Sequence, residues 1–301
     1  MALLDRAIVK LLPAVPKPVV QRISSRYIAG STLDDAVRVV RELNAEGKLA
    51  TVDVLGEEIH DAGETAAFVR AYEDVLEAIE RERLDSSISI KLTALGLKVD
   101  DELCRRNLVE VVGHAAARDT FVRIDMEDSS TTTGTLRLYR ELREAGHDNL
   151  GVVLQAYMRR TVADIRDLAD LRPNVRLCKG IYVEPPEIAF RDFDAVRANF
   201  VKALDELLGA GAYVGVATHD EWLIGQALER VAGMAPGEYE FQMLLGVRER
   251  RADELVAAGH RLRVYTPFGR EWYGYSLRRL QENPKVAGYI AGDTLGRLLG
   301  R

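Results

Sequence analysis

The chain has 301 residues, a net charge of −6 and a content of 47% hydrophobic and 29% charged residues, which is ordinary for a soluble globular protein. This length fits one large domain or two small ones, and the negative charge indicates no general attraction to nucleic acid. With only two cysteines, Cys104 and Cys178, a disulfide framework is not expected and a cysteine-rich zinc site is excluded. The cysteine content fits a reducing compartment.

The N-terminal segment is apolar, but Asp5, Arg6 and Lys10 interrupt it, so it lacks the unbroken core of a signal peptide. No apolar run in the sequence is long enough to span a bilayer. The first dozen residues could form a short amphipathic helix, which either packs on the body of the protein or touches a membrane surface. We therefore expect a cytoplasmic protein, with peripheral contact at the inner face of the cell membrane as the alternative.

Short β-rich runs alternate with amphipathic helical stretches along most of the chain. The runs are Ala50–Leu55, Ser87–Leu92, Phe121–Met126, Gly151–Tyr157, Val175–Tyr182, Tyr213–His219, Tyr239–Leu245 and Leu262–Pro267. The helical stretches include Glu64–Arg83, Glu102–Arg118, Thr135–Ala145, Phe190–Leu208, Asp220–Val231 and Glu249–Ala258. This alternation predicts an α/β fold with a parallel sheet, and eight units fit a (βα)8 barrel. We assign residues 48–301 to the barrel as one structural unit and residues 1–47 to an N-terminal helical cap.

Polar side chains lie near the carboxyl ends of these runs, where a (βα)8 barrel gathers its functional residues. They are Lys91, Asp125, Gln155, Arg176, Lys179, Thr218 and His219. A charge embedded in an apolar strand is costly to bury unless it is paired or bound to a ligand. One such residue is usually part of a structural ion pair, whereas several on different strands favour a binding site.

A further candidate site is the segment 275–282. In a helix, Tyr275 lies three and four residues before Arg278 and Arg279, and Glu282 lies three and four residues after them, so all four can share one face. Two adjacent guanidiniums oriented by a carboxylate suit a small carboxylate ligand. The alternative is a solvated, charged helix face.

Several common motifs are absent from the sequence. There is no Walker P-loop, no Gly-x-Ser-x-Gly and no His-Glu-x-x-His, and the five histidines lack metal-ligand spacing, so we expect no metal site. The glycines of the segment 209–215 superficially resemble a dinucleotide fingerprint, but their spacing is wrong and they precede a strand. We interpret this segment as a helix C-cap and turn, so any nucleotide would bind without a Rossmann loop.

Eight segments, in order along residues 48–285, resemble the proline dehydrogenase family in its compact single-function bacterial form. They are also similar to the catalytic domain of the bifunctional proline-utilisation flavoenzymes. The segments are Ser-Ile-Lys-Leu-Thr-Ala-Leu (89–95), Arg-Ile-Asp-Met-Glu (123–127), Val-Leu-Gln-Ala-Tyr (153–157), Arg-Leu-Cys-Lys-Gly-Ile-Tyr (176–182), Ala-Thr-His-Asp (217–220), Glu-Phe-Gln-Met-Leu-Leu-Gly (240–246), Arg-Val-Tyr-Thr-Pro-Phe-Gly (263–269) and Tyr-Ser-Leu-Arg-Arg-Leu-Gln-Glu (275–282). Each is weak alone, but eight in register at the strand ends of one barrel are a specific signal.

The resemblance implies a distorted (βα)8 barrel with non-covalent FAD at its carboxyl-terminal mouth and a C-terminal helix over that mouth. It implies oxidation of L-proline to (S)-1-pyrroline-5-carboxylate by hydride transfer to flavin N5, the first step of proline degradation to glutamate. Electrons then pass to a membrane quinone. Because the sequence lacks the aldehyde dehydrogenase module of the bifunctional enzymes, we expect a separate pyrroline-5-carboxylate dehydrogenase to act downstream.

For the substrate, the resemblance places Lys91, Arg278 and Arg279 around the proline carboxylate, with Glu282 bracing the arginines. Asp125 is implied to hold and balance Lys91, although a plain ion pair between these two residues would explain both. The remaining implied contacts are Tyr265 against the proline ring, Tyr275 and Tyr182 lining the pocket, and Leu245 and Leu177 as apolar wall candidates. Tyr265 would occupy the place of the hydroxyl group of hydroxyproline; the alternative is a core tyrosine.

For the flavin, the resemblance implies that Arg176 reaches N5, where a cation would stabilise the reduced, anionic form. Gln155 is implied to bond the isoalloxazine edge and Met126 to touch the flavin. Lys179, Gly180 and Ile181 are implied along the ribityl and phosphate part, and Thr218 and His219 at the FAD tail. For His219, an ordinary core histidine is the alternative.

Three other functions stay open on the sequence alone. One is a dehydrogenase for a different cyclic imino acid such as hydroxyproline, against which Tyr265 weighs. Another is a barrel aldolase or lyase that uses Lys91 or Lys179 as a Schiff-base amine. The last is a non-catalytic barrel that binds amino acids.

Overall fold

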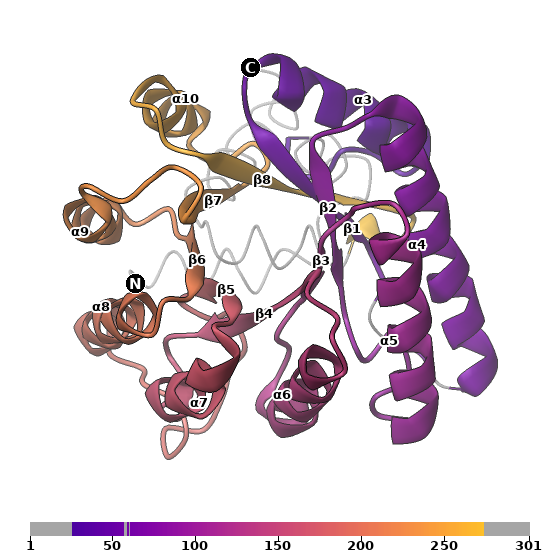
Figure 1. Ribbon diagram of the computed structural model, residues 1–301, viewed down its shortest axis with the longest axis horizontal. Coiled ribbons are helices and arrows are strands. Elements are labelled where there is room, and N and C mark those ends of the chain that lie inside the picture. The colour runs from indigo at the N-terminus through magenta and orange to yellow at the C-terminus, as the bar shows by residue number, and fades with distance from the viewer. Residues whose placement is uncertain (1–25, 57–58, 60, 274–301) are drawn as a thin grey trace, which may run out of the picture.

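The computed structural model describes residues 26–56, 59 and 61–273, and the structural statements below concern these residues. Eight parallel strands close into a barrel in chain order, and β8 returns to pair with β1 (Figure 1). The strands are β1 Leu49–Val54, β2 Ser86–Ile90, β3 Val122–Ile124, β4 Leu150–Gln155, β5 Asn174–Cys178, β6 Tyr213–Ala217, β7 Tyr239–Leu244 and β8 Leu262–Phe268. The predicted (βα)8 barrel is confirmed.

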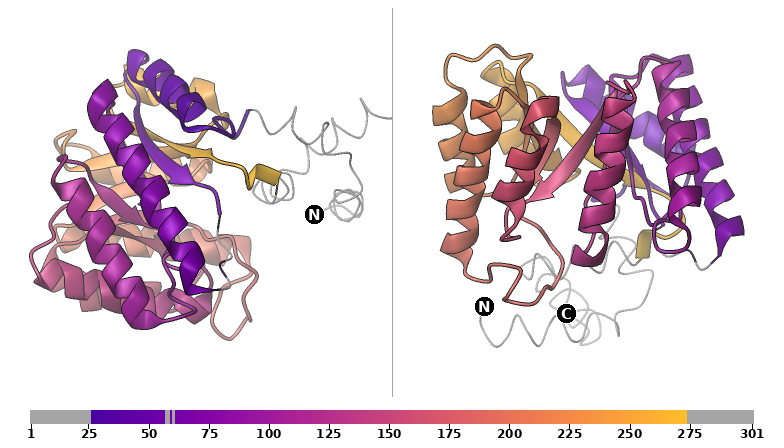
Figure 2. Two further views of the ribbon diagram at one scale, coloured as in Figure 1. Left: turned by 90° about the vertical axis from the view of Figure 1, so that its right-hand side faces the viewer. Right: turned by 60° about the horizontal axis from the view of Figure 1, so that its bottom comes forward.

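Helices surround the barrel, as Figure 2 shows from two further directions. They are α3 Leu33–Ala45, α4 Ala62–Glu82, α5 Asp101–Ala116, α6 Ser129–Glu144, α7 Thr161–Leu168, the 3-10 turn η2 Ala169–Leu171, α8 Phe193–Gly209, α9 Glu221–Val231 and α10 Glu249–Ala257. Five of them, α4, α5, α6, α8 and α9, begin after an aspartate whose side chain accepts a backbone N–H of the first turn. Helix α7 was missing from the predicted stretches, because it has only 8 residues and no side-chain cap.

The strands alternate between two environments, as the pleat requires. Ile88 and Ile90 of β2 are fully buried in the apolar core between the barrel and its helices. Their neighbours Ser87 and Ser89 face the barrel interior, where they meet side chains from other strands. The interior is therefore polar, whereas most (βα)8 barrels fill it with branched aliphatic residues.

Several strands end earlier than the sequence pattern indicated. Strand β5 ends at Cys178, so Lys179 to Tyr182 belong to the loop that follows it. Gly180 has a φ of +101°, which breaks the extended run at that point. Strand β3 likewise ends at Ile124, so Asp125 lies just beyond the strand. These end positions bring the candidate site residues to the mouth of the barrel.

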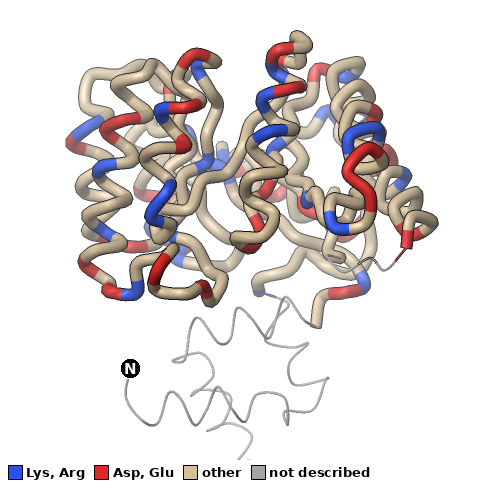
Figure 3. The backbone as a smooth tube through the Cα atoms, turned by 90° about the horizontal axis from the view of Figure 1, so that it is seen from below, with Lys and Arg blue, Asp and Glu red and all other residues tan. Residues whose placement is uncertain are grey.

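The outer helices carry both signs of charge, since Lys and Arg are interspersed with Asp and Glu in Figure 3. Helix α3 is the described helix of the predicted cap 1–47, and it packs on β1 and β8. The boundary between cap and barrel stays a prediction. Among the described helices, none is both long enough and apolar enough to cross a membrane.

Candidate active site

Four predicted site residues meet at the mouth of the barrel, although two of them directly follow β2 and β3 and the other two belong to β5 and β8. Asp125 is the centre of this group. Its Oδ1 accepts hydrogen bonds from Arg176 Nη1 at 2.7 Å and from Ser89 Oγ at 2.8 Å. Its Oδ2 accepts one from the Tyr265 hydroxyl at 2.9 Å and lies 3.9 Å from Lys91 Nζ. The structure thus brings Lys91, Asp125, Arg176 and Tyr265 together.

Lys91 has a closer partner that the sequence analysis missed. Its Nζ lies 2.7 Å from Oδ1 of Asp53, a fully buried carboxylate near the end of β1. Burial raises the pKa of Asp53 to about 6, although the Lys91 ammonium opposes this rise. The sequence does show Asp53 as a charged residue within the apolar run Ala50–Leu55. That Asp53 pairs with Lys91, however, depends on the register of β1 and β2, which sets Asp53 opposite Ser89.

Arg176 is buried and held from two sides. Besides its bonds to Asp125 and Ser89, its Nε donates to Gln242 Oε1 of β7 at 2.6 Å. Its guanidinium carbon lies 5.2 Å from the centre of the Tyr265 ring. Gln242 was also missed, although the spacing of Glu240 and Gln242 in an apolar strand shows that both face one side.

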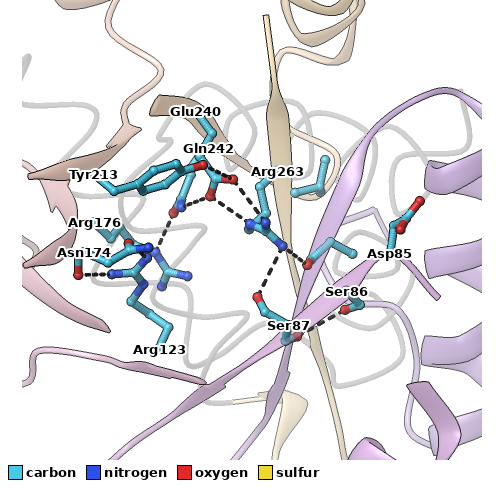
Figure 4. A network of polar contacts seen from close by, with 12 residues as sticks. Asp85, Ser86, Ser87, Arg123, Asn174, Arg176, Tyr213, Glu240, Gln242 and Arg263 are labelled. Carbon is cyan, nitrogen blue, oxygen red and sulfur yellow. Dashed lines mark hydrogen bonds and ion pairs between the residues drawn. The ribbon is translucent and has the colours of Figure 1, made fainter. Parts of the chain in front are cut away.

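A second polar cluster fills the amino-terminal end of the barrel interior (Figure 4). We call it the amino-end cluster, and it consists of Arg123, Asn174, Tyr213, Glu240 and Arg263. Glu240 accepts hydrogen bonds from Arg263 Nε at 2.7 Å and from the Tyr213 hydroxyl at 3.0 Å. Arg123 donates to the backbone oxygen of Asn174 at 2.7 Å. Burial and the nearby Arg176 guanidinium lower the pKa of Arg123 to about 9.

On the predicted flavin side, Gln155 has one satisfied and one unsatisfied end. Its Nε2 donates to the backbone oxygens of Met126 at 3.1 Å and Glu127 at 2.9 Å. Its Oε1 is buried and has no partner in the part of the chain that the structure describes. A buried acceptor without a donor is costly, so this atom is suited to a ligand N–H. Met126 is itself largely buried beside it.

The loop after β5 places Lys179, Gly180 and Ile181 at the rim. Lys179 Nζ lies 3.4 Å from Asp220 Oδ2 and 5.1 Å from the centre of the Phe193 ring. A Cβ added to Gly180 would collide with the ring of Tyr157, so only glycine fits at this position, and its proximity to a cofactor stays a prediction. Ile181 is exposed at 40%.

Arg197 of α8 joins this rim and was not among the predicted site residues. It makes two hydrogen bonds to Asp220, of 2.9 and 2.7 Å, and its guanidinium carbon lies 4.3 Å from the centre of the Phe193 ring. From the sequence, Arg197 was only one residue of the predicted helical stretch Phe190–Leu208. Together with Lys179 it places two cations beside the carboxylate of Asp220 at this part of the rim.

Thr218 and His219 follow β6 and bond mainly to neighbouring backbone. Thr218 Oγ1 accepts the backbone N–H of Asp220 at 3.1 Å. His219 Nε2 accepts the backbone N–H of Leu244 at 3.0 Å, and its carbonyl oxygen accepts from Arg248 at 2.6 Å. These contacts join the ends of β6 and β7, which gives His219 a structural role whether or not it also touches a ligand.

Of the apolar wall candidates, Leu177 is wrong. It is fully buried in the core on the face of β5 opposite to Arg176, so it cannot line a pocket at the mouth. Leu245 is partly buried, and its backbone N–H donates to the carbonyl of Tyr265 at 3.1 Å. Tyr182 packs against the small cluster around Tyr157.

The remaining predicted site residues, Tyr275, Arg278, Arg279 and Glu282, lie outside the described residues, so the arginine fork stays a prediction. Within residues 26–273, apart from the gaps given above, no group of three or more His, Cys, Asp and Glu side chains could hold a metal ion. The residues that the structure does bring together are therefore cations, carboxylates and one tyrosine at a barrel mouth.

Comparisons with known proteins agree with this arrangement. One family model, described as Proline dehydrogenase, matches residues 36–291. Proline dehydrogenase 1 of Bacillus subtilis strain 168 is 38% identical over 267 residues, which cover 88% of this chain and 88% of that protein. Proline dehydrogenase of Deinococcus radiodurans is 35% identical over 279 residues, with coverage of 91% and 90%.

Longer proteins match over part of their length. The crystal structure of proline utilization A (PutA) from Bdellovibrio bacteriovorus inactivated by N-propargylglycine has a TM-score of 0.83 at 22% identity, and the match covers 92% of this chain and 36% of that one. Bifunctional protein PutA of Escherichia coli strain K12 is 27% identical over 345 residues, covering 96% of this chain and 26% of that protein. The structural likeness, at this low identity, shows the shared barrel fold.

Proposed function

The chain belongs to the proline dehydrogenase family and is an oxidoreductase, and we propose that it oxidises L-proline to (S)-1-pyrroline-5-carboxylate with non-covalent FAD. The observation that carries this proposal is the mouth cluster in which Asp125 ties Lys91, Arg176 and Tyr265 together. This cluster places cations, which can bind a carboxylate, beside the aromatic ring of Tyr265 at the mouth of the barrel. A small cyclic amino acid has a carboxylate for the cations and an apolar ring for the tyrosine.

The substrate carboxylate would bind to cations. Lys91 is held by Asp53 at 2.7 Å, so its ammonium has a fixed position beside the centre of the mouth. We propose that Arg278 and Arg279, braced by Glu282 and accompanied by Tyr275, complete this carboxylate site. Orientation by several charge-assisted bonds would hold the ring in one pose relative to the cofactor.

Replacement of Arg278 or Arg279 by alanine tests this assignment. Each change removes a carboxylate donor, so we expect kcat/KM for proline to fall by about 2–4 kcal/mol. The measurement is steady-state kinetics with an artificial electron acceptor, beside the exposed-site control Arg250→Ala. Near-normal efficiency in both variants would refute the carboxylate role.

The mouth residues fit a flavin in two respects. The buried Gln155 Oε1 has no donor among the described residues, and the isoalloxazine edge carries an N–H that could supply one. We propose that Lys179, Gly180 and Ile181 lie along the ribityl and phosphate part of FAD, where Lys179 supplies a cation at the rim, and that Thr218 and His219 contact the FAD tail. We propose that Met126 touches the ring system. When bound, FAD supplies a hydride acceptor at N5.

Arg176 and Asp125 would have different tasks. Arg176 is proposed to present a fixed positive charge to flavin N5, because Asp125, Ser89 and Gln242 determine its orientation. Asp125 is already an acceptor for three donors, which supports a positioning role and weighs against a nucleophilic one. Tyr265 would place its ring against the substrate ring while its hydroxyl is engaged by Asp125.

A Schiff-base lyase is the main alternative in another class. It needs a neutral lysine amine, but Lys91 lies 2.7 Å from a carboxylate oxygen, an arrangement that favours the ammonium form. It also predicts covalent trapping by borohydride with a carbonyl substrate. Absence of trapping together with a bound flavin would exclude it.

The decisive experiment is a visible absorption spectrum of the purified protein before and after anaerobic addition of L-proline. We expect a flavin spectrum that proline bleaches. A colourless protein that added FAD cannot reconstitute, or a yellow one that proline leaves unchanged, would contradict the proposal. Proline binding without bleaching would instead indicate a non-catalytic binding barrel.

We further propose that electrons leave for a membrane quinone, reached by peripheral contact of a cytoplasmic protein, and that a separate pyrroline-5-carboxylate dehydrogenase uses the product. A soluble quinone analogue should reoxidise the reduced protein faster than dioxygen does. Equal rates with both oxidants would contradict the quinone assignment.

A further inference from the structure

We propose that Glu240 and Gln242 of β7 form a positioning relay for Arg176, which sets how its guanidinium faces the flavin. This inference rests on the proposed function, because it assigns a role to the presentation of Arg176. Neither residue was assigned a role at the mouth from the sequence. Glu240 and Gln242 are positioning residues, since they act through Arg176 and do not touch substrate.

The relay is a continuous chain of short hydrogen bonds inside the barrel (Figure 4). Gln242 Nε2 donates to Glu240 Oε1 at 2.5 Å, and Gln242 Oε1 accepts from Arg176 Nε at 2.6 Å. All three side chains are buried, with exposed fractions of 1% for Glu240, 5% for Gln242 and 6% for Arg176. The chain therefore links the amino-end cluster to the mouth without an intervening solvent molecule.

The chemistry of the two ends fixes the orientation of the Gln242 amide. An ionised carboxylate only accepts hydrogen bonds, and a guanidinium only donates them. The amide must therefore turn its NH2 group to Glu240 and its oxygen to Arg176. A glutamine that is held in this way offers Arg176 a single, directed acceptor, which a leucine or methionine of similar length could not do.

Glu240 is itself immobilised in the charged form. Burial alone would raise its pKa, but the Arg263 guanidinium, bonded at 2.7 and 3.1 Å, holds the pKa of Glu240 below its usual range. The Tyr213 hydroxyl donates to Oε2 at 3.0 Å, whereas Gln242 uses Oε1. The base of the relay is thus anchored independently of the mouth.

The backbone also makes room for the relay. Gly215 of β6 lies beside the Gln242 amide, and a Cβ at this position would collide with Gln242 Nε2. Glycine in the middle of a buried strand is unfavourable for the strand itself. The Gln242 side chain, which packs directly against Gly215, explains why a glycine is present here.

The relay leaves one edge of Arg176 available. Nε is held by Gln242, and Nη1 is held by Asp125 and Ser89, so the plane of the guanidinium is fixed by three partners from different parts of the barrel. For Nη2 there is no protein partner in the described part of the chain. Without Gln242, the guanidinium could rotate about its remaining bonds, and Nη2 would no longer point in one direction.

Gln242→Met tests the relay, because it keeps the length and removes both hydrogen bonds. Tyr213→Phe is the matched control, since it removes the hydrogen bond to the other oxygen of Glu240, Oε2, and leaves Gln242 and Arg176 in contact.

In the FAD-loaded protein, we expect kcat of Gln242→Met to fall roughly 10- to 100-fold, as for other supporting residues around reactive centres. KM for proline should change less than about threefold, because the carboxylate site is untouched. The flavin midpoint potential should become more negative, whereas Tyr213→Phe should keep both the potential and kcat of the wild type.

A double-mutant cycle with Arg176→Lys separates positioning from a general loss of structure. If Gln242 acts through Arg176, the double variant should have nearly the kcat of Arg176→Lys alone. Effects that multiply, or a Gln242→Met protein with wild-type potential and kcat, would overturn the relay. If Gln242→Met does not fold, Gln242→Asn keeps an amide that is one methylene too short and serves the same comparison. A wild-type protein that binds flavin and is bleached by proline keeps these outcomes distinct from a failure of the proposed function.

Discussion

The two ends of the barrel interior hold similar polar side chains, but the hydrogen-bonding groups are fully satisfied at one end and partly unsatisfied at the other. In the amino-end cluster, each oxygen of Glu240 accepts two donors, and Arg123 bonds to backbone and side-chain oxygens. At the mouth, Gln155 Oε1 has no donor in the described part of the chain, and the hydrogen bonds of Arg176 to described residues use Nε and Nη1 and leave Nη2 without an acceptor there. A satisfied network holds the barrel together, whereas an incomplete one leaves atoms for a ligand. The difference separates structural charges from functional ones within one barrel.

The most direct test of this difference is Glu240→Ala in the amino-end cluster. It leaves Arg263, Gln242 and the Tyr213 hydroxyl without their shared acceptor, so we expect the free energy of unfolding to fall by about 3–5 kcal/mol. Urea unfolding followed by circular dichroism measures this change. Tyr213→Phe, which removes one neutral donor, should cost about 1 kcal/mol. Similar small losses in both variants would show that the cluster is not an integrated network.

At the incomplete end, Asp125→Ala should act mainly on activity. Lys91 keeps Asp53 and Arg176 keeps Gln242, so we expect a stability loss of only about 1–2 kcal/mol. Because Arg176 and Tyr265 lose their common acceptor, kcat/KM for proline should fall roughly 100- to 1000-fold. Stopped-flow flavin reduction and urea unfolding on one preparation give both numbers. A stability loss as large as that of Glu240→Ala would contradict the functional assignment of this end.

Tyr265→Ser tests whether the mouth of the barrel selects proline over hydroxyproline. If the ring occupies the place of a substrate hydroxyl, its removal should raise the ratio of hydroxyproline to proline efficiency about tenfold, which corresponds to about 1.4 kcal/mol. Parallel measurements of kcat/KM with both substrates check this expectation. Tyr265→Phe keeps the ring and should leave the ratio near its wild-type value. An unchanged ratio in Tyr265→Ser would argue against ring packing.

The last expected effect is a pH dependence that comes from Asp53. Its folded pKa of about 6 lies above the ordinary value of 3.8, so the folded protein binds more protons than the unfolded chain between these values. Its contribution to stability is therefore fully present below about pH 4 and is lost as the pH rises through about 6. The stability difference between the wild type and Asp53→Asn should fall across this window and level off above it. A difference that is flat from pH 4 to 7 would contradict the raised pKa.

The sequence was sufficient for the barrel, because strands and helices alternate with clear periodicity and aspartates mark the starts of most helices. It was also sufficient for Lys91, Asp125 and Arg176 as neighbours, since the carboxyl ends of all strands of a barrel meet at one mouth. It could not give the partner of Lys91. That contact depends on the register of β1 against β2, which brings Asp53 within reach and which no single strand encodes.

One other difference has a similar origin. Leu177 was considered as a pocket wall, but the pleat of β5 turns it to the opposite face from Arg176. This error concerns which neighbour fills a given side of a residue, and that information lies in the packing of distant segments.

Glycines in two strands make room for large polar side chains inside the barrel. A methyl group at Gly151 would displace the Arg123 guanidinium, and one at Gly215 would displace the Gln242 amide. Replacing this polar interior with hydrocarbon would therefore require volume to be exchanged in pairs: a side chain added at Gly215 needs a shorter residue at position 242, and one added at Gly151 needs a shorter residue at position 123 and a shift of the Asn174 backbone. Single replacements would overfill one layer or leave a void in the next, so such a redesign should succeed only through coupled changes.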